Sequence, residues 1–231
     1  MQSSKAICFD LFNTLVSVGE VPESVGRFTA DVLGVDRERW NAACFGPAHE
    51  ICQPTVHEEI LRALAHSIDP AIPQAHIAEA VIERQARFDH ALCNVKPSVV
   101  TTLQQLKAGG FRLALISNAS TGEVAAWTAS PLAALFDVTL FSCECGLKKP
   151  EPGIYQEALS HLELQPEETL YVGDGGSQEF AGARPLGMHT VLTREYLKPQ
   201  RYRKVMAEQG EHIIGEISGL QDLLALLGLR E

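Results

Sequence analysis

The chain has 231 residues, of which 45% are hydrophobic and 21% are charged, and its formal net charge is −10. This length suits one large α/β domain, or a core of about 150 residues with a small insert. The excess of acidic over basic residues argues against a general nucleic-acid-binding face. No apolar run reaches the length of about 18 residues that a transmembrane helix needs. We therefore expect contact with neither nucleic acid nor membrane.

The first residues, MQSSKAICFD, reach an acidic residue at once and show no signal-peptide pattern. The six cysteines are scattered without the spacing of a disulfide framework. A chain of this size buries a core without disulfides, so reduced thiols and a cytoplasmic location are the natural expectation. Composition leaves a monomer and a homodimer equally open.

Residues 5–10, KAICFD, predict a short buried strand that ends at Asp10. The chain from about 20 to 92 is then helical in character. Its stretches EEILRALAHSI and IAEAVIERQARF have apolar residues at helical spacing.

From about residue 95 the pattern alternates between helices and strands. The predicted helices are SVVTTLQQLKAGG, a segment near EVAAWTAS, PGIYQEALSHL, a short one in FAGARPLGM broken by Pro185, and ISGLQDLLALLGL. The predicted strands are FRLALISN, VTLFS, TLYVGD and HTVLT. This alternation predicts an α/β fold with a doubly wound parallel sheet. The all-helical stretch is then an insertion at the carboxyl edge of the sheet, where such sheets bind ligands.

Polar residues follow four of the predicted strands. The first strand ends at Asp10, with Thr14 close behind, and the second ends at Ser117-Asn118. The third leads to Lys148-Lys149-Pro150, and the fourth ends at Asp174. Each feature alone is typical of a turn or a helix cap. Because parallel strands end at one edge of the sheet, their order predicts a single shared site.

At these positions the sequence resembles the haloacid dehalogenase superfamily. The resemblance lies in FDLFNTL (9–15), LISN (115–118), GLKKPEPGIY (146–155) and VGDGGSQEFAGARPLGM (172–188). It implies a Rossmann-like core formed by residues 1–16 and 93–231, with a small helical cap at residues 17–92. It also implies a hydrolase, in the first instance a phosphatase for a small phosphorylated metabolite.

The resemblance implies a Mg²⁺ site. Its ligands would be Asp10, Asp174 and the backbone carbonyl of Phe12, with Glu179 supporting the water shell of the metal. Hard oxygen donors with several retained waters suit Mg²⁺. A carboxylate that approaches a phosphoryl group at about 4 Å meets a repulsion of roughly 4 kcal/mol per charge pair at an effective dielectric near 20. A metal at these residues would screen that repulsion.

The resemblance also assigns the remaining roles. Asp10 would be the nucleophile that forms an aspartyl-phosphate intermediate, and Thr14 a further catalytic residue. Lys149 would neutralise negative charge, and Ser117 would hold a phosphate oxygen. Asn118 would contact the substrate.

Phe12 departs from the phosphatase pattern, which has a second aspartate two residues after the nucleophile. Phenylalanine transfers no proton, and the loss of a general acid–base typically costs about 10²–10⁴-fold in rate. One reading is a phosphatase for good leaving groups, or one in which another group, such as His49, His57 or Glu58 of the cap, supplies the proton. A second is a 2-haloacid dehalogenase, in which a halide needs no proton. Arg39 would then grip the halide and carboxylate of the substrate, and Tyr155 would match the tyrosine of those enzymes.

Two further interpretations of the sequence are a phosphonate-cleaving enzyme and a non-catalytic protein. The phosphonate-cleaving branch uses a cap lysine, and residues 17–92 contain none, so that branch is disfavoured. A non-catalytic binding or regulatory protein on the same fold is the reading from a different class. The acid at Asp174, which dehalogenases lack, favours the metal and phosphoryl transfer.

Overall fold

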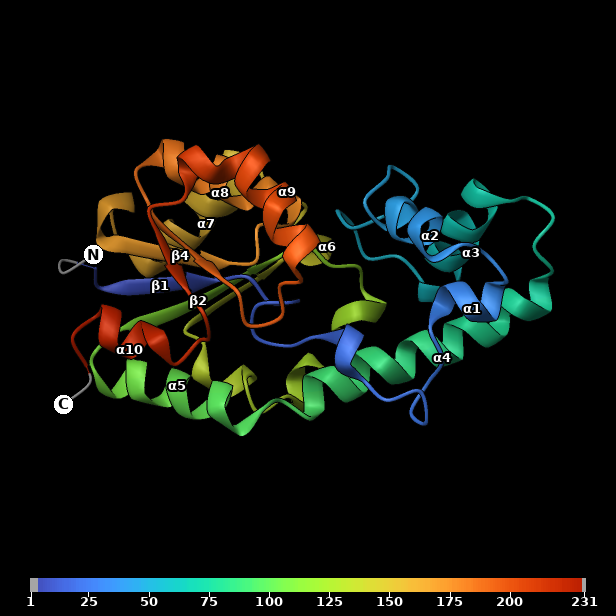
Figure 1. The fold of residues 1–231 in the computed structure, drawn as a ribbon, viewed down its shortest axis with the longest axis horizontal. Coiled ribbons are helices and arrows are strands. Elements are labelled where there is room, and N and C mark those ends of the chain that lie inside the picture. Colours follow the sequence, from blue (N-terminus) through green and yellow to red (C-terminus); the bar gives the residue numbers. More distant parts are fainter. Residues whose placement is uncertain (1–3, 230–231) are drawn as a thin grey trace.

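The computed structural model describes residues 4–229. Residues 1–3 and 230–231, which the predicted core includes, lie outside the described residues. Within residues 4–229, six parallel strands form one sheet in the order β3-β2-β1-β4-β5-β6 (Figure 1). The strands are β1 (Ala6–Phe9), β2 (Arg112–Ser117), β3 (Val138–Phe141), β4 (Thr169–Gly173), β5 (His189–Thr193) and β6 (Gly215–Ile217). The predicted doubly wound parallel sheet is confirmed.

The chain order reverses between β1 and β4, which lie side by side in the middle of the sheet. Phe9 is in register with Leu115 of β2 and Val172 of β4. The residues that follow these three strands therefore emerge together at one edge. Such a switch point is where open α/β sheets bind ligands.

Helices cover both faces of the sheet, because successive strand residues point to opposite sides. Ile7 and Phe9 pack in one hydrophobic cluster with residues of α5 (Pro97–Ala108) and α10 (Asp222–Leu226). Ala6 and Cys8 pack in a second cluster. It is formed with α7 (Pro152–Leu162), α8 (Glu179–Ala183) and α9 (Pro199–Gln209).

Four further helices form what we call the helical unit. They are α1 (Thr29–Leu33), α2 (Arg37–Cys44), α3 (His57–Ile68) and α4 (Gln74–Cys93). They share a hydrophobic cluster of their own, around Trp40, Leu61 and Leu64. Figure 1 shows this unit beyond the end of the sheet toward which the strands run. The division of the chain into a cap at 17–92 and a core elsewhere stays a prediction.

The structure corrects two predicted helices. The segment near EVAAWTAS forms only the short 3-10 helices Gly122–Val124 and Trp127–Ala129. Pro131 follows directly, and the residue before a proline favours extended backbone, which Ser130 adopts. At the carboxyl end, Ile217 belongs to β6 because it pairs with β5, and only the following Asp222–Leu226 is helical.

The sequence pattern did not predict α9 or β6, and α6 (Ser142–Cys145) replaces the end of the predicted strand VTLFS. All six cysteines are free thiols. None of the helices in residues 4–229 combines the length and apolar character that a bilayer crossing requires.

Candidate active site

The site begins at the two central strands. Asp10 follows β1 and Asp174 follows β4, and the Asp10 amide donates to the Val172 carbonyl at 3.0 Å. The strand pairing thus fixes the backbone of Asp10 beside the strand that leads to Asp174. Both side chains are buried, at 6% and 5% exposure.

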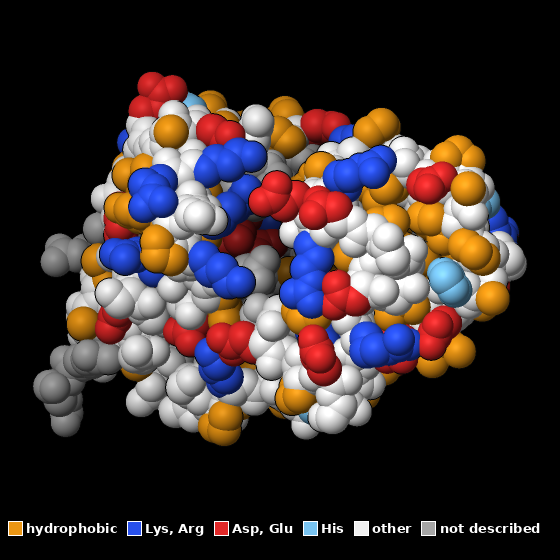
Figure 2. Space-filling view, turned by 45° about the vertical axis from the view of Figure 1, so that its right-hand side comes forward, with side chains coloured by type: hydrophobic (Ala, Val, Ile, Leu, Met, Phe, Trp, Pro, Cys, Tyr) orange, Lys and Arg blue, Asp and Glu red, His pale blue; other side chains and the backbone are white. Residues whose placement is uncertain are grey.

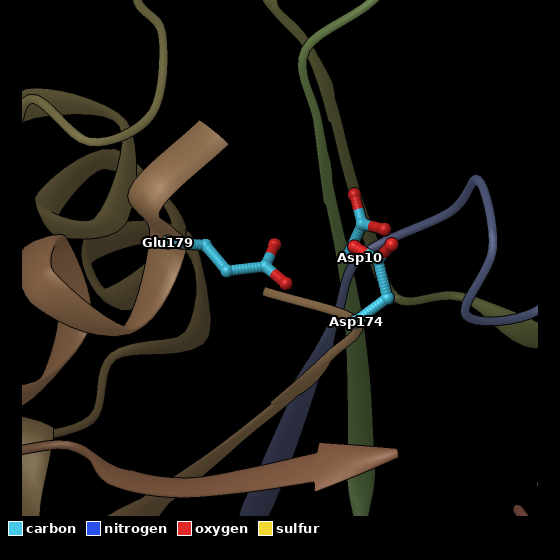
Figure 3. A group of neighbouring side chains, drawn as sticks. All are labelled: Asp10, Asp174 and Glu179. Atoms are coloured by element: carbon cyan, nitrogen blue, oxygen red, sulfur yellow. The ribbon is translucent and has the colours of Figure 1, made fainter. Parts of the chain in front are cut away.

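A third acid, Glu179, completes a buried carboxylate cluster. One oxygen from each of Asp10, Asp174 and Glu179 lies within 4.8 Å of the others. Figure 3 shows the Asp10 and Asp174 carboxylates close together and Glu179 reaching toward them from α8. Three buried carboxylates repel one another unless cations compensate them. The arrangement therefore has the donor chemistry of a hard divalent cation.

Lys149 supplies one compensating charge. Its ammonium lies 2.6 Å from Asp10 Oδ1 and 2.8 Å from Glu179 Oε2, and it donates to the Tyr171 hydroxyl at 3.1 Å. Lysine has three N–H donors, so these contacts use all of them. The side chain is only 3% exposed. Lys149, and not its half-buried neighbour Lys148, is therefore the lysine that enters the cluster.

Glu179 is held in place from both sides. Its Oε1 accepts from the Gly175 amide at 2.8 Å, and its Oε2 accepts from the Tyr171 hydroxyl at 2.9 Å. A side chain at Gly173 would place a Cβ 2.0 Å from Glu179 Oε1, so this position requires glycine. Protein donors thus occupy both oxygens of Glu179 and hold its carboxylate in place.

Asp174 differs in this respect. Its Oδ1 accepts from the Gly176 amide at 2.8 Å, while its Oδ2 accepts no hydrogen bond from residues 4–229. Burial and the nearby Asp10 raise the pKa of Asp174 to about 6, against the opposing effects of Gly176 and Arg201. A raised pKa signals a carboxylate whose negative charge is incompletely compensated by the protein. Asp174 therefore fits the role of a metal ligand.

Burial also raises the pKa of Glu179, although Lys149 opposes this shift. Burial alone would lower the pKa of Lys149, but Asp10 and Glu179 together raise it above its ordinary value. The lysine thus stays cationic at neutral pH and balances part of the cluster.

Thr14 and Ser117 lie at the same edge of the sheet as Asp10. Thr14 Oγ1 donates to Asp10 Oδ2 at 3.0 Å, so both oxygens of Asp10 have a fixed donor. Ser117, at the end of β2, is 1% exposed, and its hydroxyl is buried without a hydrogen-bond partner among the described residues. A buried hydroxyl without a partner is costly. It fits a site whose ligand supplies that partner.

Asn118 connects two of the motifs. Its Nδ2 donates to the Lys149 carbonyl at 2.9 Å, and its Oδ1 accepts from the Lys149 amide at 2.8 Å. Both ends of the amide are thus occupied by the backbone that carries the lysine. Asn118 positions Lys149, and its contact with substrate stays a prediction.

Phe12 lies at the boundary between the sheet edge and the helical unit. Its ring meets the ring of Phe88 of α4 edge to face, with 5.2 Å between the ring centroids. Phe12 is half-buried and Phe88 is buried. Where a proton-transferring aspartate would place a carboxylate, this chain therefore has an apolar aromatic pair.

Behind Phe88, a buried ion pair joins the helical unit to the loop after β2. Arg84 Nη2 lies 2.5 Å from Glu123 Oε1, and the Arg84 guanidinium lies 4.6 Å from the Phe88 ring centroid. Glu123 Oε2 accepts from the Ser120 amide at 2.9 Å, and His49 Nε2 lies 3.6 Å from Oε1. The network ties the Ser117–Ser120 turn to α4.

Among residues 4–229, Arg39 makes no contact with the carboxylates of Asp10, Asp174 and Glu179. It is on α2, and its guanidinium donates to the Ile68 carbonyl at 2.9 Å. Its part in gripping a substrate stays a prediction.

Comparison with known proteins agrees with this geometry. The family of haloacid dehalogenase-like hydrolases matches residues 4–187. The chain belongs to this family. A glyceraldehyde 3-phosphate phosphatase of Methanopyrus kandleri is 28% identical over 202 residues, 82% of this chain and 84% of that one. The (S)-2-haloacid dehalogenase 1 of Pseudomonas sp. (strain CBS-3) is 27% identical over 239 residues, 98% and 99% of the two chains.

Solved structures show the same fold. CbbY from Rhodobacter sphaeroides in complex with phosphate superposes with a TM-score of 0.64 at 22% identity, covering 98% of this chain and 100% of that one. The chain is therefore a haloacid dehalogenase-like hydrolase, and phosphatases and dehalogenases both stand among its relatives.

Sequence reasoning missed part of the site of this hydrolase. Tyr171 and Gln209 are buried polar side chains that hold the Asp174–Glu179 loop, Tyr171 through Glu179 and Gln209 through the Gly175 carbonyl at 2.8 Å. The tyrosine hydroxyl in the middle of the buried strand TLYVG was a signal for Tyr171. No signal pointed to Gln209, because α9 itself was not predicted.

Proposed function

We propose that this hydrolase is a Mg²⁺-dependent phosphatase that acts on a small phosphorylated metabolite through an aspartyl-phosphate at Asp10. The buried cluster of Asp10, Asp174 and Glu179 is the observation that carries this proposal. A halide-releasing enzyme attacks a neutral carbon and has no need for the buried acid at Asp174 beside Asp10. A phosphatase needs such a group of carboxylates to bind a divalent cation, because the cation screens the repulsion between the carboxylate nucleophile and the phosphoryl group.

The residues present fit Mg²⁺. Asp174 Oδ2 and the Asp10 carboxylate offer hard oxygen donors, and the Phe12 carbonyl is the proposed third. Glu179 would hold water bound to the metal. When bound, the ion would screen the charge between nucleophile and phosphoryl group and polarise the phosphoryl oxygens.

The chain's own residues would then act as follows. An Asp10 carboxylate oxygen attacks phosphorus, the bond to the leaving oxygen breaks, and an aspartyl-phosphate forms. Lys149 offsets the charge that accumulates on the phosphoryl oxygens, and the unpartnered Ser117 hydroxyl donates to one of them. Thr14 keeps Asp10 oriented for attack. Water then attacks phosphorus and releases phosphate.

Phe12 restricts the substrates of such an enzyme. No group at this position protonates the leaving oxygen, so we propose leaving groups that depart as stable anions, such as aryl or acyl phosphates. Because no aspartate at position 12 activates water, hydrolysis of the aspartyl-phosphate should also be slow. The intermediate should therefore accumulate after mixing with acetyl phosphate, as a mass increase at Asp10.

The test measures release of p-nitrophenol from p-nitrophenyl phosphate with Mg²⁺ and with EDTA, beside chloride release from a 2-chloroacid. Mg²⁺-dependent turnover that is lost in Asp10→Asn supports the proposal. Halide release without metal and without phosphatase activity would overturn it.

A 2-haloacid dehalogenase is the second candidate, because of Phe12 and Tyr155. The Tyr155 hydroxyl donates to the Glu179 carbonyl at 2.9 Å. This contact places Tyr155 behind the cluster. The parallel chloride assay tests this candidate directly.

A further inference from the structure

Positive charge is concentrated in one short segment of this acidic chain. Residues 194–204, REYLKPQRYRK, contain five of the chain's 19 lysines and arginines and one of its 29 acidic residues. The segment joins β5 to the first turns of α9, and β5 ends at the same edge of the sheet as β4. Figure 2 shows a hollow with several lysine and arginine side chains on its core side, one on the opposite side, and acidic side chains at its floor and upper edge.

Helix α9 packs directly on the loop that carries Asp174. A Cβ at Gly175 would lie 2.5 Å from Val205, so the two backbones approach closely there. Gln209 donates to the Gly175 carbonyl at 2.8 Å and accepts from the Phe180 amide at 3.1 Å. The position of α9 relative to the carboxylate cluster is therefore fixed by packing and by two hydrogen bonds.

Arg201 is the cation that this packing brings to the site. Its Nη2 lies 3.5 Å from the Gly175 carbonyl, next to Asp174, and its charge acts on Asp174. Arg201 is half-buried and forms no ion pair with a carboxylate of residues 4–229. One long hydrogen bond leaves most of the five guanidinium donors free.

The other cations of the segment are engaged or exposed. Arg194 stacks on the Tyr202 ring, 4.8 Å from its centroid, and Lys204 pairs with Glu208 at 3.7 Å. Lys198 and Arg203 are exposed. Arg203 lies on the same helix as Arg201 and offers a matched control.

Most arginines of the helical unit are held in ion pairs with carboxylates. Residues 17–92 contain no lysine, and each of their arginines already has a carboxylate or carbonyl partner. The partners are Glu79 and Glu83 for Arg27, Asp31 for Arg37, Ile68 for Arg39, Glu58 for Arg62, Glu123 for Arg84, and Gly26 and Val18 for Arg87. Like Arg201, Arg39 bonds only to a carbonyl, but no contact joins it to the carboxylate cluster among residues 4–229, whereas Arg201 lies next to Asp174.

We propose that Arg201 forms a subsite for a second anionic group of the substrate. The substrate is then a phosphorylated compound that also bears a carboxylate or a second phosphate. This inference rests on the proposed phosphatase function, since it places the transferred phosphoryl group at Asp10. A guanidinium binds either anion through paired N–H donors, so the experiment distinguishes the two.

The test measures binding, which needs no turnover. With Mg²⁺ at a fixed free concentration, calorimetry compares alkylphosphonates with phosphonocarboxylates and bisphosphonates of matched chain length, from two to four carbons. The proteins are wild type, Arg201→Gln and the control Arg203→Gln, each checked for an unchanged melting temperature. We expect at least one doubly anionic ligand to bind wild type about tenfold more tightly than its alkylphosphonate, because a hydrogen-bonded charge pair typically contributes this much.

Arg201→Gln should abolish that preference, and Arg203→Gln should retain it. The tighter class, phosphonocarboxylate or bisphosphonate, identifies the second anion. Equal binding of singly and doubly anionic ligands by wild type overturns the subsite and leaves the phosphatase proposal intact. A preference that survives in Arg201→Gln also overturns it. If wild type binds none of the phosphonates, the proposed function and the subsite both fail.

Discussion

The ammonium of Lys149 lies 2.6 Å from Asp10 Oδ1 although the two residues are 139 positions apart in the chain. Neither residue is more than 6% exposed. A buried ion pair of this kind costs desolvation, which its geometry must offset, and the removal of one partner leaves a buried charge uncompensated. We therefore expect the proposed chemistry and the stability of this hydrolase to depend on the same pair.

Lys149→Met should reduce both phosphatase activity and stability. It removes the cation from Asp10 and Glu179, so we expect kcat to fall by about 10²–10³-fold, as for loss of one stabilising donor. Without Mg²⁺, the free energy of unfolding should fall by about 3–5 kcal/mol. Urea unfolding and p-nitrophenyl phosphate assays measure these changes. Lys148→Met, at a half-buried position outside the carboxylate cluster, is the control, and equal losses in both variants would contradict the assigned role of Lys149.

The stability of the metal-free protein should depend on pH through Asp174. Its pKa is raised to about 6 in the folded chain by burial and Asp10, above the ordinary value near 4. Its contribution to stability is therefore fully present below about pH 4 and is lost as the pH rises through about 6. Differential scanning fluorimetry with EDTA should show this decline, and Asp174→Asn should flatten it.

Mg²⁺ should reverse that loss, because it binds the ionised carboxylates. At 100 times its Kd the ion adds about 2.7 kcal/mol, which raises the Tm of a chain of this size by roughly 5–10 °C. The shift should be large at pH 7.5 and small at pH 5. A shift that is equal at both values, or that persists in Asp174→Asn, would exclude Asp174 as a ligand.

Phe12→Asp should broaden the range of leaving groups. The new carboxylate supplies a proton donor, so hydrolysis of an alkyl phosphate should rise by about 10²-fold, with a smaller effect on p-nitrophenyl phosphate. The variant also loses the edge-to-face contact with Phe88, worth about 0.5–1.5 kcal/mol beyond area burial. Phe12→Leu separates the two effects: it loses the ring contact and should gain no alkyl phosphatase activity.

The Arg84–Glu123 pair should show strong coupling in unfolding experiments. Glu123→Gln leaves the Arg84 charge buried and should cost about 3–5 kcal/mol. The double variant Arg84→Met/Glu123→Leu should lose less stability than the sum of the losses in the single variants Arg84→Met and Glu123→Leu. Glu79→Gln weakens the exposed contact with Arg27, and its effect should stay within about 1 kcal/mol. Additive losses in the double variant would show that the buried pair contributes no coupling.

Alternation of apolar strands with amphipathic helices was sufficient to predict a doubly wound parallel sheet. Strand-end positions were sufficient to bring Asp10, Ser117, Lys149 and Asp174 to one edge. These features follow from local periodicity and from the rule that parallel strands end together. The sequence could not predict α9, whose segment PQRYRKVMAEQ is polar with few apolar positions. Its helix is stabilised by Val205 and Gln209 packing on a distant loop.

The sequence by itself determined the fold class, the family and the identity of the acids that meet at the site. Only the tertiary structure decided how their charges are balanced. Lys149 and Tyr171 converge on Glu179, Asp174 keeps one oxygen open, and Arg201 reaches the rim of the site through α9. These contacts join residues far apart in the chain, and side-chain burial and direction set them. Local sequence patterns encode neither.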